Sequence, residues 1–240
     1  GLKTGIVIKN NYIHDITDEH GTGHMLSYNP DVTVHGKIGV YNDGAGSMLT
    51  VENNVIKDVP IGFFSVGFGN KVNNNIFIDV KYPIRTREND ILISKISHQD
   101  GTYDMPEFNE KLGDTAFAEL GYLEQNGIKN PAWASKYPEV FTWKEYLNER
   151  GTDAIYPKNN ISDNLITYVK YADYAETISD IFEDKVVTEK SVMDKAGSEY
   201  DNILFEKSVE FKDFENDDFR IDENSEILKK LPGLKNIIKN

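Results

Sequence analysis

A short motif with two adjacent asparagines recurs along the N-terminal third of the chain, and it constrains the fold more than any other feature. The motif reads apolar-x-Asn-Asn-x-apolar-x-Asp-apolar, with copies within residues 5–16, 48–59 and 69–80 and a weaker copy at 159–169. Recurrence of one motif along a chain indicates a repeat architecture. The spacing from Asn54 to Asn75 is close to one turn of a parallel β-helix. We therefore predict an all-β, right-handed, single-stranded parallel β-helix, which is a solenoid.

The second asparagine of each motif is predicted to stack on its counterparts. Isoleucine, valine and phenylalanine around it favour short strands, and strands of neighbouring repeats lie about 4.8 Å apart. At that spacing, amides can donate to and accept from the repeats on either side. Because buried amides must be satisfied, we interpret this ladder as structural rather than catalytic. Its predicted members are Asn11, Asn54, Asn75 and Asn164.

An aspartate follows each of the first three ladder asparagines by four positions, as Asp15, Asp58 and Asp79. One interpretation is that all three are solvated turn residues. The other is a structural Ca²⁺ site, because stacked carboxylates repel one another unless a hard cation or protonation relieves them. Tyr168 stands at this position in the weaker copy and would end such a site. We predict no other metal or cofactor.

Changes in periodicity divide the chain into four predicted regions. Residues 1–100 carry the β-helix, which we expect to be truncated at its N-terminus because the motif starts almost at once. Residues 101–157 have apolar residues at helical spacings and are predicted to form a helical insertion. Residues 158–174 are predicted to form the last repeat. Residues 175–240 are charged and irregular, and we expect this tail to pack on the solenoid, whose strand edges would otherwise be open.

Composition excludes several classes of function. The 240-residue chain has a formal net charge of −14, which argues against a nucleic-acid partner, because phosphate binding needs clustered lysine and arginine. The chain has no cysteine, which excludes disulfides and thiolate metal sites. No apolar run reaches the roughly 18 residues that a membrane-spanning helix requires.

A glycine-rich turn supplies the first candidate site residues. Aligned on the ladder, residues 39–43 lie over residues 62–66, and extra residues in 44–46 widen the turn after Asp43. Extra glycine at a strand end can bulge and re-aim a side chain. The alternative is an ordinary Asp-Gly turn. We select Asp43 as a candidate catalytic acid, with Tyr41 and Asn42 as substrate-binding candidates.

Two further segments add candidates. Residues 17–36 form a long excursion that contains His20 and His24, which are candidates for proton transfer. Neighbouring glycines argue against a helical metal motif there, so loop polarity is the alternative. Arg85 and Arg87 share one face of an extended segment and are candidates for binding a sugar carboxylate, although pairing with nearby acids is more common.

These pieces resemble one known group of proteins, the bacterial right-handed parallel β-helix carbohydrate-active proteins of the fucosidase/xylanase type. The resemblance rests on the Asn-Asn-x-Ile-His-Asp-Ile repeat, on residues 40–47, on residues 73–79 and on the closing residues 218–221. It covers nearly the whole chain and resembles the C-terminal portion of such proteins. Members tend to carry Tyr-Leu-Asp-Asp-Gly at the turn, where this chain has Asn42 before Asp43. They also often show a His-Gly-Gly stretch one repeat later, which residues 65–67 lack.

The resemblance implies a secreted or cell-surface protein that acts on a polysaccharide or oligosaccharide. The leading expectation is a glycoside hydrolase. Hydrolysis requires two carboxyl groups, about 5–5.5 Å apart for retention and about 6.5–9.5 Å for inversion. A non-catalytic glycan-binding module is the first alternative, because one turn acid and the histidine are missing. A polysaccharide lyase that uses the two arginines is the second.

Overall fold

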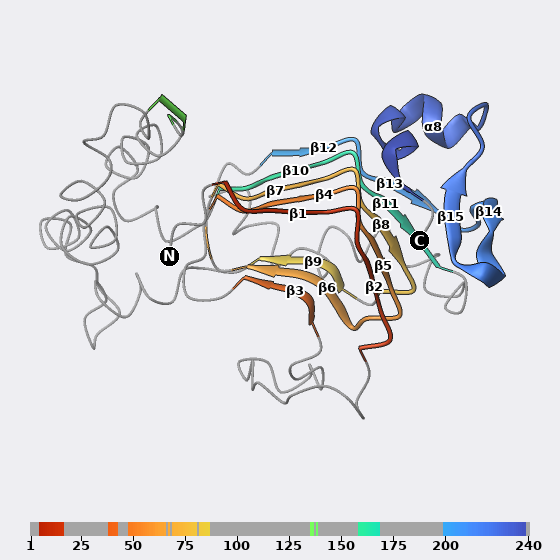
Figure 1. Ribbon diagram of the computed structural model, residues 1–240, viewed down its shortest axis with the longest axis horizontal. Coiled ribbons are helices and arrows are strands. Elements are labelled where there is room, and N and C mark those ends of the chain that lie inside the picture. Colours follow the sequence, from red (N-terminus) through yellow and green to blue (C-terminus); the bar gives the residue numbers. More distant parts are fainter. Residues whose placement is uncertain are drawn as a thin grey trace, which may run out of the picture.

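The computed structural model of the chain describes residues 5–16, 38–42, 48–65, 67, 69–80, 82–86, 135–136, 138, 158–168 and 199–238. The described residues are predominantly β-structure (Figure 1). No helix among them is long and apolar enough to cross a membrane. The strands are short, and most of them have three residues. Their bounds are β1 Val7–Lys9, β2 Tyr12–His14, β3 Ile38–Asn42, β4 Thr50–Glu52, β5 Val55–Lys57, β6 Ile61–Ser65, β7 Lys71–Asn73, β8 Ile76–Ile78, β9 Tyr82–Thr86, β10 Asn160–Ser162, β11 Leu165–Thr167, β12 Glu199–Asp201, β13 Leu204–Glu206, β14 Phe211–Asp213 and β15 Asp218–Ile221.

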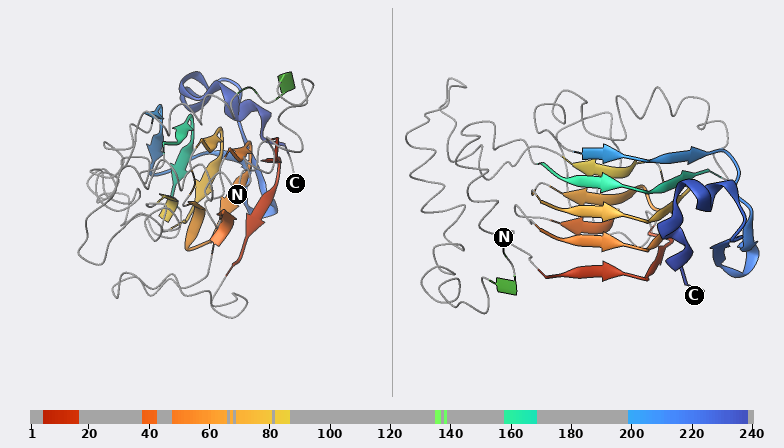
Figure 2. Two further views of the ribbon diagram at one scale, coloured as in Figure 1. Left: turned by 90° about the vertical axis from the view of Figure 1, so that its left-hand side faces the viewer. Right: turned by 90° about the horizontal axis from the view of Figure 1, so that it is seen from above.

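The strands form four sheets. Two parallel five-stranded sheets have the orders β1-β4-β7-β10-β12 and β13-β11-β8-β5-β2, and a third parallel sheet has the order β3-β6-β9. The fourth sheet is the antiparallel pair β14 and β15. Each step along a parallel sheet is a step to the next repeat, so the strands lie side by side like rungs, with β1 at one edge and β12 at the other (Figure 2).

The predicted fold class is wrong. The described residues form separate sheets of two to five strands, and not a single-stranded right-handed β-helix. Left-handed backbone conformations help to break the pairing into separate sheets. Asn10, Asn53 and Asn74 have φ values of 57°, 55° and 56°, and each follows directly after a three-residue strand. The C-terminal segment adds antiparallel pairing, the short helix α8 (Glu226–Lys230) and two 3₁₀ turns.

The Asn-Asn motif accounts for the local structure of each repeat. Its first asparagine takes the left-handed conformation, which Asn and Asp adopt more readily than other non-glycine residues. Its aspartate does the same, because Asp15, Asp58 and Asp79 have φ values of 54°, 53° and 53°. Two left-handed residues per motif therefore mark the two turns that flank β2, β5 and β8.

The main core lies between the three parallel sheets. Each sheet contributes its inward-facing residues, such as Val51, Phe77 and Phe63, which are all fully buried. The core needs a glycine in β6, because a Cβ at Gly62 would lie 2.5 Å from the carbonyl oxygen of Pro83 and 2.7 Å from the Phe77 ring. Close packing of the sheets therefore requires glycine, which has no Cβ, at this position.

A second apolar cluster covers the outer face of the β13-β11-β8-β5-β2 sheet. Ile76 and Ile78 alternate with Phe77 and yet are fully buried, because the C-terminal segment, residues 207–238, packs on them. A sheet that is covered on both faces has continuous apolar strands, which explains the sequence Ile-Phe-Ile in β8. The covering residues are Phe219, Ile221, Leu228, Leu231, Leu234 and Ile237.

The stack continues past the predicted last repeat. We expected the repeat to end before residue 175, whereas β12 pairs in parallel with β10, and β13 pairs in parallel with β11. The register places Leu204 opposite Leu165, so Ile203 occupies the position of the ladder asparagine. The sequence signal was weak here because the residue that defines the motif is absent.

Candidate ligand-binding face

The predicted asparagine ladder is confirmed. The Nδ2 atoms of Asn11, Asn54 and Asn75 each donate to the Oδ1 of the next member, over 2.9, 3.0 and 3.0 Å. The backbone N–H of each donor residue is 3.0 Å from the same oxygen. The amides of Asn54, Asn75 and Asn164 are fully buried, so these three members are structural and present no group to a ligand, whereas Asn11 at the end of the ladder is exposed.

A second buried amide network holds the end of β3. Asn70 Oδ1 accepts from the backbone N–H of Leu49 at 3.0 Å and from Asn42 Nδ2 at 3.1 Å. The Nδ2 of Asn42 is also 3.2 Å from Ser65 Oγ. Asn70 Nδ2 donates in turn to Asn159 Oδ1 in the next repeat. Leu49 is the counterpart of Asn70 one repeat earlier and has no side-chain amide, so Asn42 supplies the missing side-chain donor. Asn42 is fully buried, and this placement differs from the substrate contact that we expected of it.

The outward row of the β3-β6-β9 sheet carries two of the predicted binding residues. Tyr41 pairs in register with Phe64, and Phe64 pairs with Arg85. This register confirms the alignment of residues 39–42 over 62–65. The rings of Tyr41 and Phe64 are 5.5 Å apart and tilted by 34°. Tyr41 is 37% exposed, which makes it one of only four large apolar side chains exposed among the described residues.

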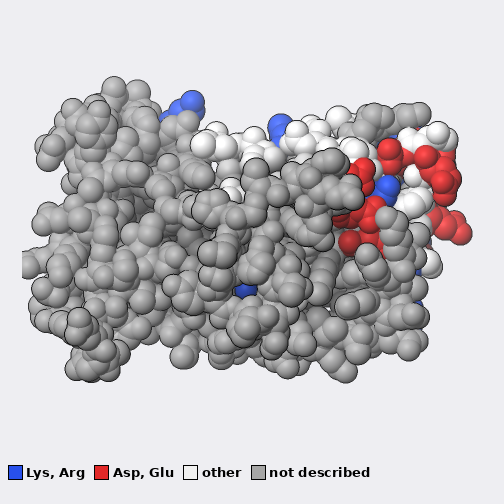
Figure 3. Space-filling model, turned by 90° about the horizontal axis from the view of Figure 1, so that it is seen from below, with Lys and Arg blue, Asp and Glu red and all other residues white. Residues whose placement is uncertain are grey.

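Tyr82 and Arg85 extend this row along β9. The guanidinium carbon of Arg85 lies 5.9 Å from the centre of the Tyr82 ring, a distance at which a cation is attracted to the ring face. Both side chains are half-buried. Figure 3 views the molecule from the side of this sheet, and the acidic side chains visible there gather at the end that the C-terminal segment occupies. We name Tyr41, Phe64, Tyr82 and Arg85 the aromatic–arginine face.

The other predicted site residues lie outside the described residues. These are Asp43, His20, His24 and Arg87. Asp43 follows directly after Asn42 and Tyr41, at the end of β3. Sequence reasoning missed Phe64 and Tyr82, although the alignment of the repeats already placed Phe64 beside Tyr41.

Within the described ranges, no group of three or more histidine, aspartate or glutamate side chains could hold a metal ion. The Ca²⁺ interpretation of Asp15, Asp58 and Asp79 therefore has no support from clustering, and their left-handed backbone accounts for their recurrence.

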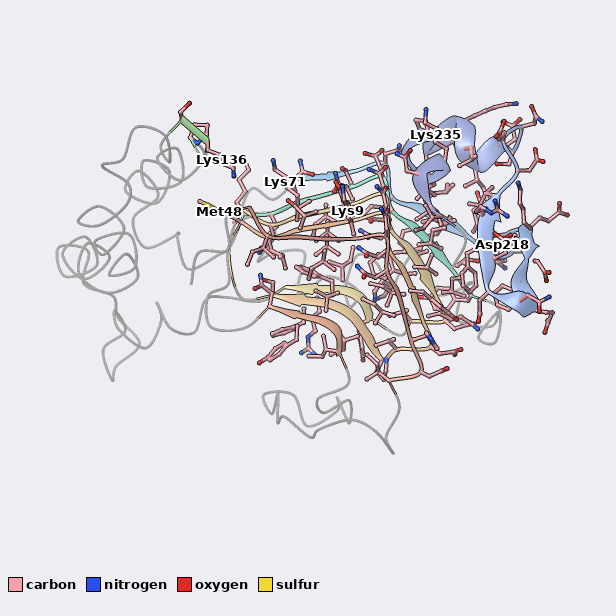
Figure 4. All side chains as sticks on the ribbon, in the orientation of Figure 1. Lys9, Met48, Lys71, Lys136, Asp218 and Lys235 are labelled. Atoms are coloured by element: carbon pink, nitrogen blue, oxygen red, sulfur yellow. The ribbon has the colours of Figure 1, made fainter. Side chains whose placement is uncertain are left out.

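In the opposite direction from the aromatic–arginine face, Lys9 and Lys71 project from the outer side of the β1-β4-β7-β10-β12 sheet (Figure 4).

A polar cluster joins the first repeat to the C-terminal segment. The Tyr12 hydroxyl donates to Asp217 at 2.8 Å, and burial together with this hydrogen bond raises the pKa of Tyr12 above its ordinary value. The His14 ring stacks on Tyr12 at 4.1 Å, and His14 Nδ1 lies 2.8 Å from Asp15 Oδ2. The contacts with Asp217 connect segments far apart in sequence, so this cluster is primarily a structural clasp.

Comparison of the chain with protein-family models, with curated proteins and with solved structures found no match.

Proposed function

We propose that this chain is a carbohydrate-active protein that binds a polysaccharide or oligosaccharide on the aromatic–arginine face, outside the cell or at its surface. The observation that supports the proposal is that the exposed Tyr41 and the half-buried Arg85 lie in one row, with Tyr82 beneath the guanidinium. Phe64 between them is fully buried and supports the Tyr41 ring from beneath the surface. Sugars have an apolar face of C–H groups that packs on aromatic rings, and hydroxyl or carboxylate groups that accept from arginine. Tyr41 is accessible for such stacking.

The test measures the retardation of the chain in gels that contain soluble neutral or uronate-rich polysaccharides. Tyr41→Ala is expected to weaken binding by up to about tenfold, because it removes one ring contact. Arg85→Gln is expected to weaken binding to uronate polymers more than to neutral ones. Ile238→Ala, which shortens a 50% exposed apolar side chain in the C-terminal segment, is the matched control. The proposal fails if no polysaccharide retards the chain, or if Tyr41→Ala binds as well as the unmodified protein.

Glycoside hydrolysis is the second candidate function, and the position of Asp43 favours it. Asp43 directly follows Tyr41 and Asn42 in the sequence, next to the end of β3. Asp43→Asn is expected to abolish release of reducing ends from a polysaccharide that the chain binds, while binding itself persists. Asp222→Asn, at an exposed acid far from this face, is the control. Binding without reducing ends would favour the non-catalytic module, and unsaturated products would favour a lyase.

A further inference from the structure

Among the described residues, one edge of the stack leaves apolar and hydrogen-bonding groups without a neighbouring strand. Of the described strands, β1, β2 and β3 are the terminal ones of their sheets on the same side. An edge strand presents a row of backbone N–H and C=O groups that can pair with another strand. The inward residues Ile8 and Ile13 are only half-buried, whereas Val51 and Ile56, one repeat further in, are fully buried. Ile6 and Val7 are 49% and 48% exposed.

The asparagine ladder is also incomplete at this edge. Inside the stack, each ladder Oδ1 accepts from both the backbone N–H and the Nδ2 of the preceding member. Among the described residues, the Oδ1 of Asn11 accepts neither bond. Its Nδ2 donates to the Lys9 carbonyl in its own repeat. Asn75 makes the equivalent bond to the Asn73 carbonyl of its own repeat. Unlike Asn11, Asn54 and Asn75 also donate to the preceding repeat, at the Ile8 and Val51 carbonyls.

We propose that the edge formed by β1 and β2 is a docking surface for one further strand–turn–strand segment that carries the Asn-Asn motif. The geometry of the inner repeats specifies this occupant. Its ladder asparagine donates through N–H and Nδ2 to Asn11 Oδ1. Its first strand lies parallel to β1 and supplies the carbonyl for Asn11 Nδ2, and its apolar residues cover Ile8 and Ile13. A segment without the asparagine buries Asn11 Oδ1 without the side-chain donor that the inner repeats supply, which is costly.

A second copy of the chain fits this edge poorly. Head-to-tail stacking would bring β12 and β13 of one copy against β1 and β2 of the other. That arrangement places Ile203 at the ladder position next to Asn11, and an isoleucine side chain cannot donate. A two-fold arrangement would make the two β1 strands antiparallel, whereas the ladder requires parallel strands in register. The occupant is therefore a segment with its own motif.

The experiment adds a synthetic peptide with the sequence of residues 48–59 to the full chain. It measures peptide affinity and the hydrogen exchange of the β1 and β2 amides. With peptide at about ten times its Kd, exchange at β1 and β2 is expected to slow by about tenfold. A peptide that carries Asn54→Leu is expected to bind about tenfold more weakly, because its side-chain donor to Asn11 is lost and the Asn11 oxygen becomes poorly satisfied. This comparison needs no variant of the chain.

A matched pair of chain variants completes the test. Asn11→Leu is expected to weaken binding of the unmodified peptide and to remove the difference between the two peptides. Asn224→Leu introduces the same side chain at an exposed position in the C-terminal segment and is expected to change neither. The proposal is overturned by equal binding of the two peptides, by β1 and β2 amides already as protected in the free chain as those of β4 and β5, or by a dimer that occupies this edge and resists the peptide.

Discussion

At the scale of single residues, the same amino acid has three different tasks in this protein. Asn74 adopts the left-handed backbone, Asn75 joins the ladder, and Asn42 closes the gap that Leu49 leaves beside Asn70. The first task depends on a short side chain that tolerates positive φ. The second depends on an amide that donates and accepts at once, and the third depends on the donor group of the amide. The burial of Asn42 also explains why an aspartate would be unfavourable at that position.

Asn42→Asp is expected to destabilise the chain at neutral pH by about 2–4 kcal/mol, because a buried carboxylate cannot donate to Ser65 Oγ or Asn70 Oδ1. Burial raises the folded-state pKa of the introduced carboxyl group above its unfolded value of about 4. Stability is therefore lost as the pH rises from the unfolded pKa toward the higher folded-state pKa. The loss of stability relative to the unmodified chain is expected to be smaller at about pH 3 than at about pH 7. Urea unfolding at the two pH values measures it, with exposed Asn224→Asp as the control. Equal deficits at both would contradict the explanation.

The recurrent aspartates allow a test that separates backbone conformation from ion binding. At Asp58, with a φ of 53°, valine is expected to cost about 1–2 kcal/mol, whereas glycine changes stability by less than about 0.5 kcal/mol. Unfolding of both variants is measured with and without added Ca²⁺. A Ca²⁺-dependent stability that Asp58→Gly removes would instead assign these carboxylates to a cation site.

At the scale of elements, the C-terminal segment makes the outer face of β5, β8 and β11 part of the interior. Its apolar side chains bury Val55, Ile76 and Leu165. The clasp between Tyr12 and Asp217 adds a polar contact, and the Lys57 ammonium lies 3.7 Å from Asp217. Short three-residue strands have little stability of their own, so this covering segment stabilises the second sheet through apolar burial.

The clasp predicts a particular response to alkaline pH. The folded-state pKa of Tyr12 is raised, first by burial and then by the hydrogen bond to Asp217. Its stabilising contribution is therefore complete below the unfolded pKa of about 10 and is lost as the pH rises above that value. Tyr12→Phe is expected to lower stability at about pH 7 by about 0.5–1 kcal/mol and to make the alkaline loss shallower. An unchanged alkaline slope in pH-dependent urea unfolding would rule out this role.

At the scale of the whole molecule, burial differs between the middle and the open edge of the stack. Val51 and Val72 are fully buried in the middle, whereas Ile8 at the edge is half-buried. In a repeat architecture each unit is stabilised mainly by its neighbours, so a unit with one described neighbour opens more readily than a unit with two.

Native-state hydrogen exchange is expected to follow this gradient. The amides of β4, β5, β7 and β8 are expected to exchange at least about tenfold more slowly than those of β1 and β2, because opening free energies are lowest where few apolar contacts hold a strand. Exchange monitored by NMR measures the difference. Uniform protection across these strands would mean that the stack opens only as one unit.

The sequence by itself determined the repeat, the ladder and its register, because the same motif surrounds Asn11, Asn54 and Asn75 and each amide needs a partner in the next repeat. Sequence reasoning also selected Tyr41 and Arg85 as candidates for ligand binding. Only the tertiary structure decided that the strands form separate sheets, that Asn42 is buried and that β12 and β13 extend the stack past the last motif. These features depend on contacts between distant segments, and local patterns do not record which partner a residue meets.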